Sequence, residues 1–326
     1  MPPSLALPAG TGRVRLSLTA GPLAALESAP AEGVAARGEL ICVPGFTGSK
    51  EDFLPLLEPL SRVGLRVLAI DQRGQCDSPG LPAHRPYTLR GYGQELRELI
   101  EQRAAASGSR PHLLAHSFGG YVARSALLDG PALPLASLTL LGTGPGAVPR
   151  PAADRVRLFL AISSVMSPVR GNRLLLLDRH RDPSVQAFLR HRIRGNDTRS
   201  LRAIARWLLN EPDRVDPLAA VLRRDALACF VLCGADERTW PVPTQRRMAQ
   251  RLDAPFAAVP HAGHSVNVEQ PAEVVARLLD FWAGLAPADG SGTAAAEAAP
   301  GQGEDTHGET GQRPGPAHAS AEATRG

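Results

Sequence analysis

Residues 114–120 constrain the fold of this chain most strongly, because a strand pattern changes there to a helix pattern across a single residue. That residue is Ser117. A turn this sharp brings backbone segments very close together, so it needs small residues two positions before and after the serine. Ala115 and Gly119 stand at those positions, and Gly120 lets the helix pack tightly. The pattern predicts a serine nucleophile on a strand-to-helix turn, and the alternative is a Ser-Gly-Gly turn that only binds an anion.

Short apolar runs alternate with helical spacing along most of the chain. Runs typical of buried strands cover residues 39–43, 65–70, 111–115, 135–141, 228–233 and 256–259. Apolar residues at helical spacing follow over 53–60, 89–106, 118–128, 243–252 and 271–282. Two further strands, 13–18 and 23–28, read as an opening antiparallel hairpin. This alternation predicts an α/β fold with a doubly wound, mostly parallel, eight-stranded sheet.

The rhythm changes between residues 149 and 226, where helical patterns occur at 158–165, 185–192 and 201–209 without a convincing strand. We interpret this stretch as an all-helical lid inserted into a core formed by residues 13–148 and 227–285. Residues 1–12 are expected to form a flexible arm. Residues 286–326 carry almost no large apolar side chain and cannot offset the entropy of ordering, so a disordered tail is expected there.

The charge pattern does not indicate a nucleic-acid-binding protein. The formal net charge is +4, but Lys50 is the only lysine, and the arginines are scattered along a chain with 4% aromatic residues. The densest basic stretch, residues 179–194, also contains Asp182 and reads as a solvated helix face. We interpret the excess of arginine, alanine, glycine and proline as the composition of a GC-rich bacterium.

Targeting signals and disulfide motifs are not evident. The first residues lack the basic region and long apolar core of a signal peptide, and no apolar run approaches the roughly 18 residues of a membrane span. Four cysteines, Cys42, Cys76, Cys229 and Cys233, form no Cys-x-x-Cys motif. These observations predict a cytoplasmic protein without a membrane span.

A serine hydroxyl needs an adjacent base to act as a nucleophile. His264 follows Gly263 directly after the last predicted strand, at the same sheet edge as the serine, and is the candidate base. His261 is expected to shape that loop. His116 is expected to point to the opposite side of the turn, and His112, inside a strand, to be a satisfied core residue.

The histidine in turn needs a carboxylate that selects its tautomer and stabilises its protonated form. The loop after the strand at 228–233 offers two, Asp236 and Glu237. The resulting order of serine, acid and histidine along the chain is one of the known orders of a catalytic triad.

Four motifs in this order resemble the α/β-hydrolase superfamily, in its compact esterase, lactonase and perhydrolase branch. Residues 44–49, Pro-Gly-Phe-Thr-Gly-Ser, resemble the family's His-Gly-Phe-x-Gly-Ser, and residues 71–78 resemble its Asp-x-Arg-Gly-x-Gly-x-Ser. The nucleophile turn and the Gly-His loop complete the set, and the resemblance covers residues 13–284. It implies an oxyanion hole formed by the backbone N–H groups of Phe46 and Phe118, although Pro44 replaces the family's histidine.

The family's acid position falls on Glu237, so we favour Glu237 over Asp236, which could serve if the loop shifts. If both are solvated loop charges, a Ser-His dyad remains. Serine at the nucleophile position argues against dehalogenase and epoxide hydrolase chemistry, which use aspartate there.

These residues together predict a carboxylesterase-like serine hydrolase that cleaves a small or medium ester, thioester or lactone through an acyl-enzyme. The same triad could instead support C–C bond hydrolysis, perhydrolysis or acyl transfer, and the fold also hosts non-catalytic ligand-binding proteins. No zinc-type cluster, P-loop or Rossmann signature is present, so neither a metal nor another cofactor is implied. A substrate with an apolar acyl or alcohol part is expected under a roof formed by Leu158, Phe159, Ile162, Val165 and Met166. The sequence does not indicate an oligomeric state.

Overall fold

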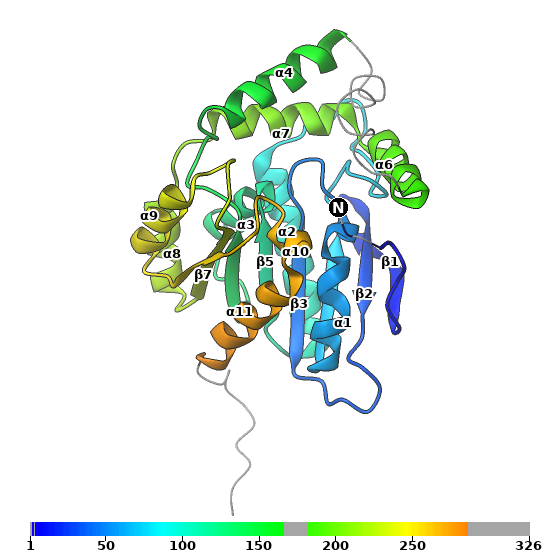
Figure 1. Ribbon diagram of the computed structural model, residues 1–326, viewed down its shortest axis with the longest axis vertical. Coiled ribbons are helices and arrows are strands. Elements are labelled where there is room, and N and C mark those ends of the chain that lie inside the picture. The colour runs from blue at the N-terminus through cyan, green and yellow to red at the C-terminus, as the bar shows by residue number, and fades with distance from the viewer. Residues whose placement is uncertain (1, 3, 166–181, 286–326) are drawn as a thin grey trace, which may run out of the picture. The chain divides into compact units, whose positions relative to one another are not determined.

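The computed structural model describes residue 2 and residues 4–165 and 182–285 (Figure 1). The predicted tail at 286–326 and the roof residue Met166 lie outside these ranges. None of the described helices is both long enough and apolar enough to cross a membrane.

The predicted eight-stranded sheet is confirmed, with the strand order β1-β2-β4-β3-β5-β6-β7-β8. The strands are β1 Thr11–Leu18, β2 Gly21–Ser28, β3 Gly38–Val43, β4 Leu65–Ile70, β5 His112–His116, β6 Ser137–Leu141, β7 Ala228–Gly234 and β8 Phe256–Val259. The first two strands form an antiparallel hairpin that joins β4 antiparallel, and all other neighbours pair in parallel. The carboxyl ends of β3, β5, β6, β7 and β8 therefore meet at one edge.

Helices cover both faces of the sheet because side chains alternate along the buried strands. In β3, Ile41 and Val43 enter one apolar cluster while Leu40 and Cys42 enter the other. The first cluster is covered by α2 Leu89–Ser107, α3 Phe118–Leu128, α8 Val215–Arg224 and α9 Val242–Leu252. The second is covered by α1 Leu54–Arg62, α10 Val266–Glu269 and α11 Pro271–Ala283. Figure 1 shows α1 and α11 on the near side of the sheet.

The described residues between β6 and β7 are helical, with α4 Ala152–Val165, α6 Pro183–Gly195 and α7 Thr198–Asn210 ahead of α8. In Figure 1, α4 and α7 lie beyond one end of the strands. The Phe159 ring of α4 contacts Phe46 in the loop after β3, which places α4 over the carboxyl edge of the sheet.

Helix α8 was not predicted, and it occupies a different layer from the other inserted helices. Its buried side chains Val215, Leu218 and Leu222 recur at helical spacing and join the apolar cluster beneath α3 and α9. The helices over the sheet edge therefore end before α8, earlier than the expected boundary at residue 226.

The expected flexible arm is packed along part of its length. Leu5 and Leu7 lie partly buried against the apolar cluster under α1 and α11, and β1 begins at Thr11. These two leucines attach the otherwise irregular segment to the core.

The only lysine of the chain is buried directly after the loop that follows β3. The Nζ atom of Lys50 lies 2.7 Å from Asp71, 2.6 Å from Asp77 and 2.9 Å from Glu51. Burial lowers the pKa of this ammonium, but the neighbouring carboxylates outweigh that effect and raise it. The ion cluster joins η1 Lys50–Phe53 to the loop after β4.

His112 is the satisfied core residue that its position in a strand predicted. Its Nδ1 atom lies 2.7 Å from Ser137 Oγ, and its ring stacks on Trp282 with centroids 4.4 Å apart. Burial lowers the pKa of His112 from 6.5 to about 4. The folded protein therefore binds a proton at His112 less tightly than the unfolded chain does. The contribution of His112 to the free energy of unfolding is at its maximum above pH 6.5 and is lost as the pH falls towards 4.

We expect His112→Gln, which removes this titration, to lose less stability on acidification than the unsubstituted protein. Between pH 7 and pH 5 the difference in the change of unfolding free energy should be about 1–2 kcal/mol. Urea denaturation of both proteins at the two pH values measures it. Equal losses in the two proteins would show that His112 is not protonated on unfolding in this range.

Candidate active site

Ser117 occupies a strained turn between β5 and α3. Its backbone has φ 54° and ψ −116°, a conformation that a residue with a side chain adopts only when its surroundings enforce it. The Ser117 N–H donates to Leu141 O at 2.9 Å, which ties the turn to β6, and the side chain is largely buried. The turn thus presents the hydroxyl at the carboxyl edge of the sheet, where the sequence predicted a nucleophile.

Glycines around this turn are required by steric contact. A Cβ atom at Gly119 would lie 2.5 Å from Val43 O, and one at Gly120 would lie 2.6 Å from the Thr143 side chain. Opposite the serine, a Cβ at Gly45 would lie 2.7 Å from Ser117 Cβ. The helix therefore begins against the end of β3, and the loop after β3 runs directly past the serine.

The structure brings His264 and Ser117 together. The His264 Nε2 atom lies 2.9 Å from Ser117 Oγ, and its Nδ1 atom lies 2.7 Å from Glu237 Oε2. Because an ionised carboxylate can only accept, the Nδ1 atom carries the proton and donates it to Glu237. The lone pair on Nε2 is then free to accept from the serine hydroxyl.

The two candidate acids have different surroundings. Glu237 is buried and its Oε1 atom accepts from the Thr239 N–H at 2.5 Å, whereas Asp236 is exposed to solvent. Burial opposes ionisation of Glu237, but the hydrogen bond and charge of His264 outweigh it and hold the pKa of Glu237 below its usual value. Gly142, with a φ of 53°, lies next to this carboxylate, and a Cβ atom there would lie 3.4 Å from Glu237 Oε2.

The expectation for His116 was wrong. Its side chain faces the candidate base, and its Nε2–H donates to the backbone carbonyl of His264 at 2.9 Å. Burial and the nearby His264 lower the pKa of His116 to about 4, so the ring is neutral near pH 7. His116 is the last residue of β5, directly before Ser117, and no sequence pattern indicated this contact. The contact supports the backbone of the His264 loop.

The two expected oxyanion donors flank the serine. Phe118 is the first residue of α3, and Phe46 follows Gly45 in the loop beside the serine. Among the described residues, neither backbone N–H donates a hydrogen bond to a protein group. The N-terminus of α3 also carries a partial positive charge, which favours a developing anion.

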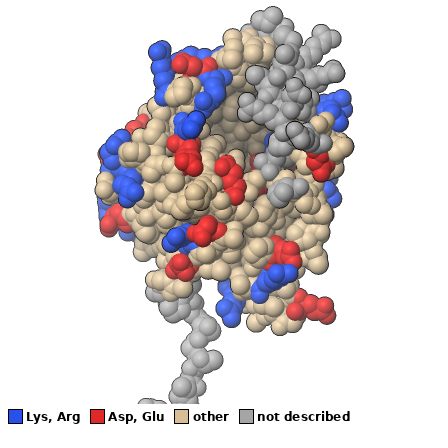
Figure 2. Space-filling view, in the orientation of Figure 1, with Lys and Arg blue, Asp and Glu red and all other residues tan. Residues whose placement is uncertain are grey.

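The surface is hollowed below α4 (Figure 2). The Phe159 ring meets Phe46 edge-on with centroids 5.1 Å apart, and Ile162 is partly buried. Leu158 was expected to form part of the apolar roof, but 52% of its surface is exposed. The side chain of Val165 lies outside the described part of the structure, as does Met166.

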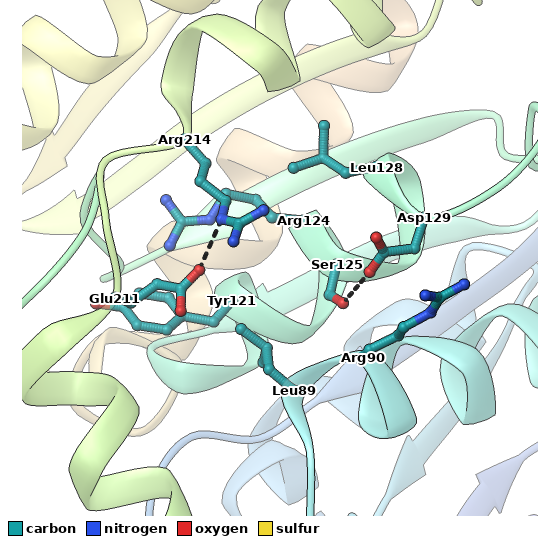
Figure 3. Close-up of a pocket in the computed structure, with 9 residues that line it drawn as sticks. All are labelled: Leu89, Arg90, Tyr121, Arg124, Ser125, Leu128, Asp129, Glu211 and Arg214. Atoms are coloured by element: carbon teal, nitrogen blue, oxygen red, sulfur yellow. Dashed lines mark hydrogen bonds and ion pairs between the residues drawn. The ribbon is translucent and has the colours of Figure 1, made fainter.

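A second cavity, of about 190 Å³, lies between α2, α3 and the α7–α8 connection (Figure 3). None of the predicted site residues lines it. Its wall includes Arg124, whose buried guanidinium donates to Gly144 O at 2.9 Å and Pro145 O at 2.6 Å. Burial lowers the pKa of Arg124. This arginine holds the loop after β6, which runs past Trp240 beside His264.

Within the described ranges, Cys76, Asp77 and His191 bring three potential metal ligands within 4.8 Å of one another. Asp77 is already paired with Lys50 and His191, at 2.6 Å in each case. A buried ammonium at this distance repels a cation, so the cluster is better explained as an ion-pair network.

Comparisons with known proteins identify the family of the chain. Residues 40–278 match the model of the alpha/beta hydrolase family, and the chain belongs to this family. The chain is 27% identical over 270 residues to a putative carbamate hydrolase, RutD, from Variovorax paradoxus (strain S110), covering 78% of this chain and 93% of the relative.

Solved structures share the fold. A thermophilic esterase from Thermogutta terrifontis has a TM-score of 0.63 at 22% identity, covering 83% of this chain and 97% of the esterase. A hydrolase from Pseudomonas aeruginosa PA01 has a TM-score of 0.65 at 24% identity, covering 84% and 99%. The predicted family and fold are thereby confirmed, and a hydrolase activity is supported.

Proposed function

We propose that this hydrolase uses Ser117 as a nucleophile to transfer an acyl group from an ester, thioester or lactone to water. The observation that carries the proposal is the continuous series of contacts from Ser117 Oγ to His264 Nε2 at 2.9 Å and from His264 Nδ1 to Glu237 at 2.7 Å. The backbone N–H groups of Phe46 and Phe118, which have no protein acceptor within the described residues, complete the set of parts that acyl transfer needs.

In the proposed reaction, His264 takes the hydroxyl proton of Ser117 while Ser117 Oγ attacks the substrate carbonyl. The N–H groups of Phe46 and Phe118 donate hydrogen bonds to the developing oxyanion, and Glu237 stabilises the imidazolium. His264 then protonates the leaving alcohol or thiol, which leaves the serine acylated. A water molecule deprotonated by His264 releases the acid and restores the hydroxyl.

Helices α4, α6 and α7 act in this proposal as a lid over the carboxyl edge of the sheet. The aromatic contact between Phe46 and Phe159 gives the entrance an apolar surface, which suits a small or medium substrate with an apolar part. The name of the Variovorax relative adds carbamates to the carbonyl compounds that a substrate panel should include.

A fluorophosphonate probe tests the nucleophile. We expect it to label the native protein stoichiometrically and Ser117→Ala not at all. Ser125→Ala is the matched control, because Ser125 is also a buried α3-region serine, and its Oγ lies 2.7 Å from Asp129. Mass spectrometry of the intact proteins measures the adduct. A native protein that stays unlabelled where a control esterase reacts would refute the proposed function.

Substitution of the two candidate acids tests which of them assists His264. Glu237→Gln should lower kcat by about 10²–10⁴, because the amide can no longer stabilise the imidazolium or select the tautomer. Asp236→Asn, one residue earlier and exposed, should stay within about threefold of the native kcat. Steady-state kinetics on one ester compares the two variants, and the reverse ranking would assign the role to Asp236.

A further inference from the structure

The peptide group between Gly45 and Phe46 carries one of the two N–H groups assigned to the oxyanion hole. The group is planar and trans, so the Gly45 carbonyl and the Phe46 N–H point in opposite directions and move together. Any contact that holds the Gly45 oxygen therefore also sets the direction of the Phe46 N–H.

Two donors hold that oxygen. The Gly48 N–H closes a tight local turn at 3.1 Å, and the Gln75 side chain reaches it from the loop after β4, also at 3.1 Å. The turn alone is strained, because Thr47 within it has a φ of 59° without being glycine. The glutamine supplies support from a separate segment, the loop after β4.

The burial of Gln75 is not explained by packing. Its side chain is fully buried, and within the described structure its Oε1 atom has no hydrogen-bond partner. Burying an unpartnered amide oxygen costs free energy that a methionine or leucine of similar size would avoid. The contact of its Nε2 with Gly45 is the compensation visible in the structure.

A second glutamine acts on the neighbouring peptide. Gln72 Nε2 donates to Pro44 O at 2.8 Å, and this carbonyl belongs to the peptide before the one that carries the Phe46 N–H. Each glutamine therefore contacts a different peptide of this loop, and of the two only Gln75 contacts the peptide that carries the Phe46 N–H.

We propose that Gln75 is a positioning residue that aims the Phe46 N–H at the substrate oxyanion through the Gly45 carbonyl. The assignment rests on the proposed function. Since the N–H is needed most when negative charge develops, loss of the contact should weaken the transition state more than substrate binding.

The test is Gln75→Met, with Gln75→Leu as a second variant of different shape. We expect kcat to fall by about 10- to 100-fold with KM changed less than threefold, since loss of an oxyanion donor itself costs about 10²–10³ in kcat. Affinity for a trifluoromethyl ketone, whose adduct with serine bears an oxyanion, should fall by the same factor as kcat/KM. Affinity for the neutral alcohol product should not change.

Gln245→Met is the matched control. Gln245 is also fully buried, its Nε2 also donates to a backbone carbonyl, that of Trp240 at 2.8 Å, and its Oε1 is also unpartnered in the described structure. It should retain kcat within threefold. A folded Gln75 variant with native kcat would overturn the role of Gln75, and so would a Gln245→Met variant that loses as much kcat as Gln75→Met. Either result would leave the proposed function standing. A native protein with neither turnover nor probe labelling overturns the proposed function and this role together.

Discussion

The structure depends on the absence of side chains where β5 turns into α3. Gly119 lies against the Val43 carbonyl and Gly45 against Ser117, so two segments of the sheet edge meet with no room for a Cβ atom. This close packing holds Ser117 in its strained conformation and places the loop after β3 beside it. The parallel strands then bring the loops after β7 and β8 to the same edge, and with them Glu237 and His264.

Much of this arrangement was predictable because it depends on local patterns. Apolar runs located six of the eight strands, and the other two were expected as an opening hairpin. Glycine and histidine after strand ends indicated the serine turn and the candidate base. The apolar residues Val215, Leu218 and Leu222 recur at helical spacing, so the sequence also indicates α8, which was not predicted. Its place in the helical layer that covers the sheet, however, follows from packing against α3 and α9.

Contacts between segments that are distant in sequence could not be predicted from local patterns. Asp236 and Glu237 are adjacent in sequence, and only the fold shows that one is exposed while the other is buried against His264. The contact of His116 with the His264 carbonyl joins residues 148 positions apart. Gln75 stands in a variable position of its motif, so nothing in the sequence marked its contact with Gly45.

Acylation of Ser117 during turnover is the step on which the proposed function depends. Rapid quenching during the first turnovers of an activated ester, followed by mass spectrometry of proteolytic fragments, measures it directly. We expect one acyl group per chain, on the fragment that contains Ser117, formed before steady-state release of the acid. Turnover with an unmodified Ser117, or with the acyl group on another residue, would contradict it.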